Sequence, residues 1–165
     1  MIYNKHIIVM IGNIGSGKST VVETFVNKHG FLRISRDAFR YMLNNYVWKS
    51  ELEHYVWELE RFAAEILMEA KLNIIVDEVG VSKRLRLSYI MFAKEYGYTI
   101  AAYVMPRLSK EESIKRRLQK PHGNQDAKMW EEVWERFDKT YEDPSFEEGF
   151  DTIIDHDKGE RKKVL

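Results

Sequence analysis

Gly12-Asn13-Ile14-Gly15-Ser16-Gly17-Lys18-Ser19 is the stretch that decides the fold of this 165-residue chain. It satisfies the pattern G-x-x-x-x-G-K-[ST], in which a glycine-rich loop surrounds a phosphate with its backbone N–H groups. The pattern is meaningful only between a strand and a helix. The apolar run at 6–11 is typical of a buried parallel strand, and apolar residues recur at helical spacing over 21–26. The sequence therefore predicts a nucleoside triphosphate site.

Each part of this loop has an expected contact. The glycines allow positive φ angles, and the helix that follows presents its positive dipole end to the phosphates. We expect Lys18 to contact the outer phosphates and Ser19 to supply a hydroxyl ligand to Mg²⁺. The predicted contacts to ATP or another nucleoside triphosphate are Gly12, Asn13, Gly15, Ser16, Gly17, Lys18, Ser19 and Thr20.

The composition is typical of a soluble protein, with 44% hydrophobic and 32% charged residues. No apolar run approaches the ~20 residues that cross a bilayer, and the first predicted strand begins almost at the N-terminus. We therefore expect no membrane contact, no signal peptide and a cytoplasmic location. The chain has no cysteine, which excludes disulfides and thiolate metal sites. Lys plus Arg (26) balance Asp plus Glu (26), which gives no electrostatic reason for extended binding along nucleic acid.

Strand and helix patterns alternate along the chain. Further strands are predicted at 31–34, 74–77, 99–105 and 151–154. Helices are predicted at 37–46, 50–72, 82–96, 109–118 and 126–141. This order predicts an α/β protein with a P-loop kinase-like three-layer fold, a five-stranded parallel sheet and a helical lid. We expect a single domain over 1–165, with the lid at about 115–126 and a short tail at 161–165.

The helix predicted at 50–72 has one apolar face. It is marked by Leu52, Tyr55, Leu59, Phe62, Ile66 and Ala70. The four tryptophans lie in predicted helical regions, so we expect core packing for them. Tyr46 and Trp48, in the turn at 44–49, are a possible exception as candidates for base stacking.

The predicted strand at 74–77 ends in an acidic residue, Asp77, and a second acidic residue, Glu78, follows it. Asp77 stands where a P-loop enzyme keeps the carboxylate that holds Mg²⁺, directly or through water, and it is the expected metal ligand together with Ser19. Glu78 competes for the same role. The alternative is that Asp77 caps the next loop.

Asp37 and Arg40 stand three residues apart at a predicted helix start, so they share one face. A positioned carboxylate can take the proton of an alcohol acceptor, whereas an acceptor that is already a phosphate needs no base. Asp37 therefore favours a hydroxyl acceptor, and Arg40 indicates a phosphate elsewhere on that acceptor. The alternative is an N-capping Asp with an Arg partner, which is common on soluble helices.

Four cations lie just before the loop at 121–124, at the end of the helix predicted at 109–118. They are Lys115, Arg116, Arg117 and Lys120. Cations brought over the triphosphate by lid closure would neutralise the charge that builds up in phosphoryl transfer. Lys and Arg also favour helix C-termini for purely structural reasons. The predicted catalytic residues are Lys18, Asp37, Arg40, Arg116 and Arg117.

With these residues in place, the chain resembles the 5′-hydroxyl kinase domain of bacteriophage polynucleotide kinases over roughly 6–157. The segment Ile34-Ser35-Arg36-Asp37-Ala38-Phe39-Arg40 looks like the acceptor motif of that family. The resemblance implies that Asp37 is the general base and that Arg40 binds the phosphate adjoining the terminal nucleotide. Asp77 stands where the family keeps a strand-end Asp. The family lid is usually read as two arginines; Arg116 matches one, and Lys120 or Arg117 serves as the other.

The leading hypothesis is ATP- and Mg²⁺-dependent phosphorylation of the 5′-hydroxyl end of DNA or RNA. A P-loop kinase that acts on a small alcohol, such as a nucleoside or a hydroxymethylated base, is the first alternative, and the neutral net charge slightly favours it. A nucleotide-binding regulatory or toxin-like module is the second. The expected partner is a 5′-hydroxyl nucleic-acid end or a small nucleoside-like acceptor. No oligomeric state is predicted.

Overall fold

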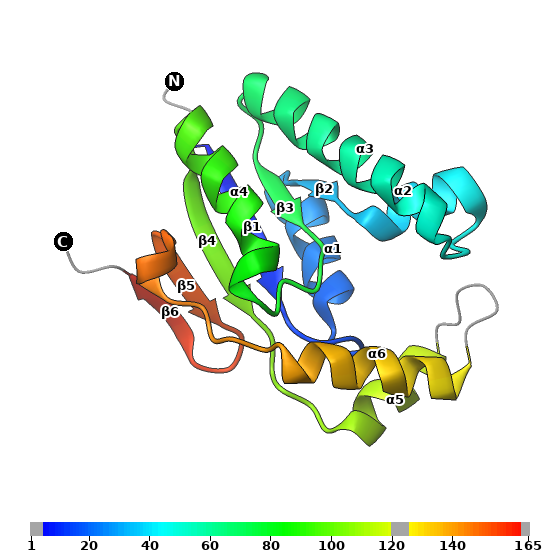
Figure 1. Ribbon diagram of the computed structural model, residues 1–165. Helices are drawn as coiled ribbons and strands as arrows, with labels where there is room; N and C mark the ends of the chain where they lie inside the picture. Colours follow the sequence, from blue (N-terminus) through cyan, green and yellow to red (C-terminus); the bar gives the residue numbers. More distant parts are fainter. Residues whose placement is uncertain (1–4, 120–125, 163–165) are drawn as a thin grey trace.

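The computed structural model describes residues 5–119 and 126–162, which form one sheet with helices around it (Figure 1). The strands are β1 (His6–Ile11), β2 (Leu32–Ile34), β3 (Ile74–Val76), β4 (Thr99–Val104), β5 (Thr152–Asp155) and β6 (Gly159–Lys162). The helices are α1 (Lys18–His29), α2 (Arg36–Asn44), α3 (Ser50–Glu69), α4 (Lys83–Tyr96), α5 (Lys110–Leu118) and α6 (Ala127–Lys139), with a short 3₁₀ helix η1 (Phe146–Glu148).

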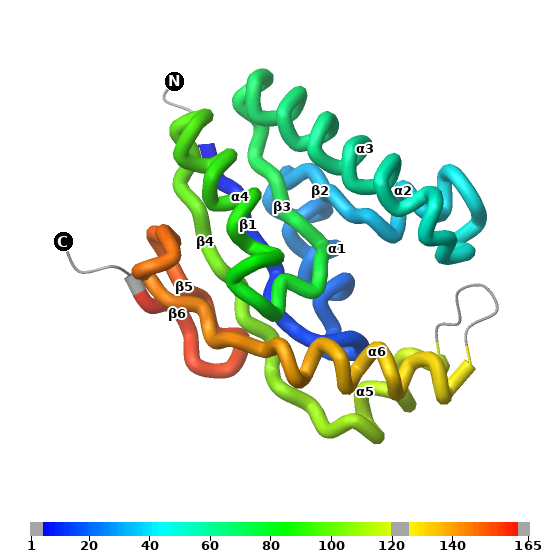
Figure 2. Tube along the Cα trace, viewed as in Figure 1, coloured from blue at the N-terminus to red at the C-terminus, as the bar shows by residue number. Residues whose placement is uncertain are grey.

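The sheet has the strand order β2-β3-β1-β4-β5-β6, and β1 to β5 are mutually parallel. Side chains of β1 alternate between two apolar layers, as they must in an extended strand. Ile7, Val9 and Ile11 pack with α3 and α4, whereas Ile8 and Met10 pack with α1. Figure 2 traces the resulting alternation of strand and helix along the chain. The predicted α/β fold class is confirmed.

The sheet has one strand more than predicted. Arg161 and Lys162, expected in a tail, belong to β6, which pairs antiparallel with β5. The sequence of β6 is Gly-Glu-Arg-Lys, so it carries no alternation of apolar and polar residues that would indicate a strand. Backbone hydrogen bonds to the neighbouring strand form it instead. The last residues of the expected tail, 163–165, lie outside the described residues.

Most of the apolar face predicted for α3 is turned toward solvent, and only Leu52 and Leu59 of this face are half-buried. Phe62 is 61% exposed, Tyr55 59% and Ile66 47%. The buried residues of α3 are Val56, Glu60, Ala64 and Met68, on a neighbouring stripe. Small and flexible side chains on this stripe let the helix approach the sheet, and Glu60 is satisfied there by Tyr89. Within the described residues, no helix has both the length and the apolar character needed to cross a membrane.

The two helices α5 and α6 pack against each other beside the phosphate loop (Figure 1). The lid predicted at about 115–126 therefore begins in the last turns of α5. Its central part, 120–125, including Lys120, lies outside the described residues.

Candidate active site

The phosphate loop leaves the sheet at the carboxyl end of its central strand β1, where open α/β sheets bind ligands. Gly15 and Gly17 have φ angles of 69° and 93°, in the left-handed region that favours glycine. A Cβ on Gly15 would lie 2.3 Å from the carbonyl oxygen of Ser113 in α5. Ile14 packs in an apolar cluster with α5 and α6. The loop is therefore held directly against these two helices.

Within the described residues, the interior of the loop carries one unpaired hydroxyl, that of Ser16, and the partly buried ammonium of Lys18. The Lys18 Nζ donates to the carbonyl oxygens of Gly12 and Asn13 at 2.9 and 2.8 Å. Burial lowers the pKa of Lys18 to about 8, although nearby carboxylates, chiefly Asp77, raise it. The Ser16 Oγ is buried without a hydrogen-bond partner among the described residues. A partly buried ammonium and an unpaired hydroxyl inside a glycine-rich loop fit a bound phosphate.

The residues predicted to hold Mg²⁺ lie together at the ends of β3 and the phosphate loop. The Ser19 Oγ donates to the Asp77 carboxylate at 3.2 Å. The Asp77 carboxylate also forms an ion pair with Arg33 of β2. A hydroxyl and one carboxylate, completed by phosphate oxygens and water, suit Mg²⁺. In the described part of the chain, no cluster of three or more His, Cys, Asp or Glu residues is arranged to hold a metal ion.

A buried charged network next to this site has no counterpart in the sequence analysis. Glu78 accepts from the backbone N–H of Arg36 at 2.6 Å and pairs with its guanidinium at 2.8 Å. The same guanidinium lies 3.4 Å from Glu60 and 4.0 Å from the ring centre of Trp57. Glu60 in turn accepts from the Tyr89 hydroxyl. Burial raises the pKa of both carboxyls, that of Glu78 to about 7.

This network fixes the start of α2 to the end of β3. Arg36 and Glu78 are 42 residues apart in the chain, so no local sequence pattern could have indicated this network. It also separates the two acidic residues after β3. Glu78 is committed to Arg36, whereas Asp77 faces Ser19.

Asp37 and Arg40 share one face of α2, as predicted. The Arg40 Nη1 donates to Asp37 at 2.7 Å, and the Asp37 side chain is 57% exposed. The N-cap of α2 is Ser35, so the capping role considered for Asp37 does not apply, although its Arg partner is present. The Arg40 guanidinium also donates to both oxygens of Glu53 in α3, at 2.8 and 2.7 Å. Arg40 is thus held between two acidic side chains.

The two arginines at the end of α5 have different surroundings. Arg116 is exposed and pairs with Glu112 one turn earlier at 2.6 Å. The Arg117 guanidinium lies 4.2 Å from the ring centre of Trp130, and its Nε is buried with no hydrogen-bond partner in the described ranges. Burial lowers the pKa of Arg117, while the charge of Asp37 raises it. Arg117 therefore lies within electrostatic reach of the α2 carboxylate.

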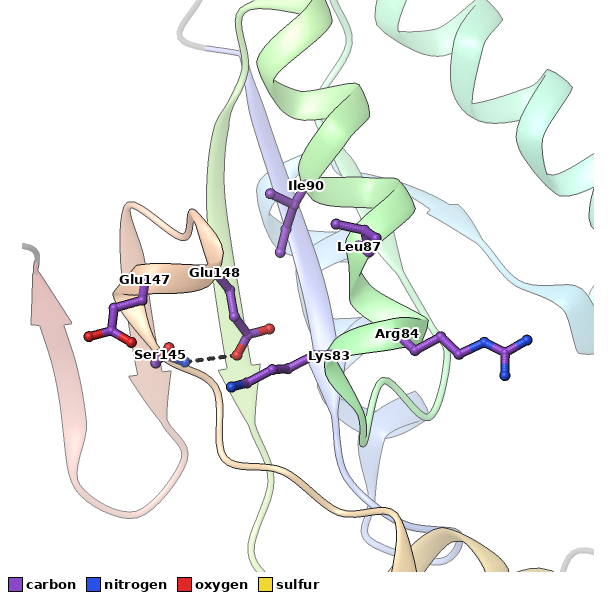
Figure 3. Close-up of a pocket in the computed structure, with 7 residues that line it drawn as sticks. All are labelled: Lys83, Arg84, Leu87, Ile90, Ser145, Glu147 and Glu148. Atoms are coloured by element: carbon purple, nitrogen blue, oxygen red, sulfur yellow. Dashed lines mark hydrogen bonds between the residues drawn. The ribbon is translucent and has the colours of Figure 1, made fainter.

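A separate pocket of about 330 Å³ opens between α4 and η1 (Figure 3). It is lined by Lys83, Arg84, Leu87, Ile90, Ser145, Glu147 and Glu148. Glu148 is held there by the backbone N–H of Ser145 at 3.0 Å. None of the predicted site residues lines this pocket.

Several solved structures share this fold. A structure of the Pnkp1/Rnl/Hen1 RNA repair complex aligns with 100% of this chain and 50% of the other chain, at 22% identity and a TM-score of 0.69. Kti12 of Chaetomium thermophilum in complex with ADP-AlF3 aligns over 86% and 82% of the two chains, at 20% identity and a TM-score of 0.56. A gluconokinase of Sinorhizobium meliloti 1021 aligns over 92% and 83%, at 19% identity and a TM-score of 0.52.

At these identities the likeness shows the fold alone, and one fold hosts many substrates. This chain spans about half the length of the RNA repair chain that it matches. The family match is more direct, because the AAA domain family matches residues 7–144, most of the chain. The phosphate loop, the parallel sheet and this match agree, and the chain belongs to the AAA domain family.

Proposed function

We propose that this chain transfers the γ-phosphate of ATP to the 5′-hydroxyl end of a polynucleotide, DNA or RNA, with the help of Mg²⁺. The observation that carries the proposal is the position of Asp37. Its carboxylate is exposed and lies within electrostatic reach of Lys18 and Arg117: burial lowers the pKa of both cations, and the charge of Asp37 partly opposes this lowering. A base for an alcohol therefore stands near two cations suited to a triphosphate.

In the proposed reaction, the acceptor hydroxyl oxygen forms a bond to the γ-phosphorus, and the bond from that phosphorus to the bridging oxygen of ADP breaks. The hydroxyl proton passes to Asp37. Lys18 and the loop N–H groups hold the phosphates, and Arg117 neutralises the charge that develops during transfer. Ser19 and Asp77 would hold Mg²⁺, which supplies further charge neutralisation when bound.

A small-alcohol kinase is the second candidate, and the state of Arg40 favours it. The guanidinium is already bonded to Glu53 and Asp37, so an acceptor phosphate would have to displace one of these carboxylates. A nucleoside or a sugar acid needs no such exchange. The gluconokinase among the structures that share this fold is consistent with this candidate.

The choice of acceptor separates these candidates. We expect labelled ATP to phosphorylate a nucleoside 3′-monophosphate or a short 5′-hydroxyl oligonucleotide better than the bare nucleoside or gluconate. The expected advantage is about ten- to a hundredfold in kcat/KM, the effect of a charge-assisted contact, and Arg40→Ala should remove most of it. Equal use of the nucleoside and its 3′-phosphate would instead support the small-alcohol kinase. Nucleotide binding without transfer to any acceptor would support a regulatory or toxin-like module.

The two lid arginines provide a matched pair of variants. Arg117→Ala should lower kcat by roughly 10²-fold, because it removes a preorganised charge near the transferred group. Arg116→Ala should leave kcat nearly unchanged, because Arg116 is exposed and paired within α5. Steady-state kinetics with saturating ATP checks both. A larger loss in Arg116→Ala than in Arg117→Ala would assign the transfer role to Arg116.

A further inference from the structure

The end of α2 and the turn that joins it to α3 carry aromatic side chains for which the proposed phosphoryl transfer has no use. Tyr41 is 56% exposed and Trp48 is 61% exposed, so Trp48 lies outside the core, in line with its treatment in the sequence analysis as an exception to core packing. Tyr46 stands between them in the chain. Met42 and Val47 are also exposed. Because exposed apolar groups gathered in one short segment often mark a binding surface, Tyr41, Tyr46 and Trp48 are here called the aromatic wall.

The backbone of this turn is held in an unusual conformation. Asn45 and Tyr46 have φ angles of 48° and 66°. A positive φ angle is rare for a bulky aromatic residue such as Tyr46. Two hydrogen bonds close the turn. The side-chain amide of Asn44 donates to the carbonyl oxygen of Val47 at 3.0 Å, and the N–H of Val47 donates to the carbonyl oxygen of Asn44 at 2.9 Å. The Tyr46 ring stacks on the Tyr41 ring, with 4.8 Å between centroids and 29° between planes. Strained residues of this kind cluster at functional sites.

The aromatic wall adjoins the acceptor side of the candidate active site. Tyr41 directly follows Arg40 and lies one helical turn after Asp37. Burial lowers the pKa of Arg117, and an electrostatic interaction with Tyr46 partly opposes this lowering. The turn therefore lies within electrostatic reach of the end of α5. In Figure 1 the turn between α2 and α3 lies on the same side of the molecule as the end of α5 and the start of α6. The aromatic wall thus follows the acceptor-side residues Asp37 and Arg40 in the chain and lies within electrostatic reach of Arg117.

We propose that the aromatic wall stacks against the bases of a single-stranded acceptor end. This inference rests on the proposed function, whose substrate class it narrows. Every nucleobase offers a flat π face, so stacking on aromatic side chains binds single strands with little base preference. A sugar acid has no ring system of this kind. A base that stacks on a side chain must leave its own helix, so the site should select single-stranded or frayed 5′ ends over fully paired blunt ends.

Binding tests the inference independently of transfer. The probe is a fluorescein-labelled, single-stranded 5′-hydroxyl oligonucleotide, whose anisotropy is followed on titration with the full chain. Tyr41→Ala and Trp48→Ala should each raise Kd by about tenfold, the usual effect of losing one base–aromatic stack. Tyr41→Phe keeps the ring and should bind like the wild type. Phe62→Ala, an equally exposed aromatic on α3 outside the wall, is the matched control and should also bind like the wild type.

Transfer gives the second measurement. The acceptors are an oligonucleotide, the same strand with an abasic 5′ residue, and a blunt duplex. The wild type should use the intact single strand about tenfold better in kcat/KM than either of the others, and both alanine variants should lose this preference. Unchanged Kd in both alanine variants, with normal phosphorylation, would overturn the inference alone. Binding that depends on the wall without phosphorylation of any acceptor would overturn only the proposed function. If the wild type fails to bind the strand, both fail.

Discussion

Burial and charge oppose each other at Lys18, and the conflict makes nucleotide binding depend on pH. Its pKa is lowered to about 8 in the nucleotide-free loop because burial disfavours the ammonium. A bound triphosphate would raise that pKa again, so binding should take up a proton above pH 8. We therefore expect the affinity for a non-hydrolysable ATP analogue to fall between pH 7 and pH 9.

Isothermal titration calorimetry in buffers of different ionisation enthalpy measures both the affinity and the proton uptake. Lys18→Arg is the matched control, because a guanidinium stays charged over this range. Its affinity should change less with pH. An affinity of the wild type that is constant from pH 7 to pH 9 would contradict the assignment.

Asp37 is expected to act on the acceptor and not on the nucleotide. Asp37→Asn should reduce kcat by about 10²-fold or more, the usual cost of losing a general base, with little change in ATP affinity. Single-turnover kinetics and nucleotide titration measure the two effects separately. A variant that lost ATP affinity and kept its turnover would place Asp37 at the metal site instead.

Among the elements, α2 depends on β3 through the buried pair of Arg36 and Glu78. The folded protein holds the Glu78 pKa near 7, above the value of about 4.5 in an unfolded chain. A carboxyl whose folded pKa is raised contributes stability below its unfolded pKa and loses it as the pH rises through the folded one. The free energy of unfolding of the wild type should therefore fall from pH 5 to pH 8 relative to that of Glu78→Gln.

Urea denaturation of both proteins at the two pH values measures this difference. Glu58→Gln, at an exposed ion pair on α3, should follow the wild type and is the control. If the unfolding free energies of the wild type and Glu78→Gln changed in parallel with pH, the pH dependence would come from a group other than Glu78. The same variant should lower kcat and keep ATP affinity, because it loosens the start of α2 near the acceptor and leaves the phosphate loop intact.

At the scale of the whole molecule, one buried arginine ties distant segments together. Arg86 of α4 is 0% exposed and donates to both carboxylate oxygens of Glu148 in η1 at 2.8 Å. It also donates to the carbonyl oxygens of Gly80 and Glu142. Arg86→Ala leaves a buried carboxylate without its partner, so we expect a loss of about 3 to 5 kcal/mol in unfolding free energy.

Thermal and denaturant unfolding test this prediction against Arg61→Ala. Arg61 also pairs with a carboxylate, but on the exposed surface of α3, so its removal should cause no measurable loss. Equal effects of the two substitutions would mean that burial does not set the strength of the Arg86 contacts.

Local patterns in the sequence determined the phosphate loop and the order of strands and helices. The phosphate loop is a run of eight residues whose spacing carries its own chemistry, and the apolar runs of β1 and β3 identify buried strands without reference to their neighbours. The pairing of Asp37 with Arg40 was likewise predictable, because residues three apart in a helix are neighbours on its surface.

Only the tertiary structure decided which face of α3 meets the sheet and whether β6 forms. It also decided which side chains contact the guanidinium groups of Arg36 and Arg117. An apolar stripe predicts a helix face but not its neighbour, so the exposed Phe62 could not be distinguished from a core residue. Arg36 meets Glu78 across a long stretch of chain, and Arg117 of α5 meets Trp130 of the following helix, α6. Such contacts depend on the packing of whole elements, and local periodicity contains no information about it.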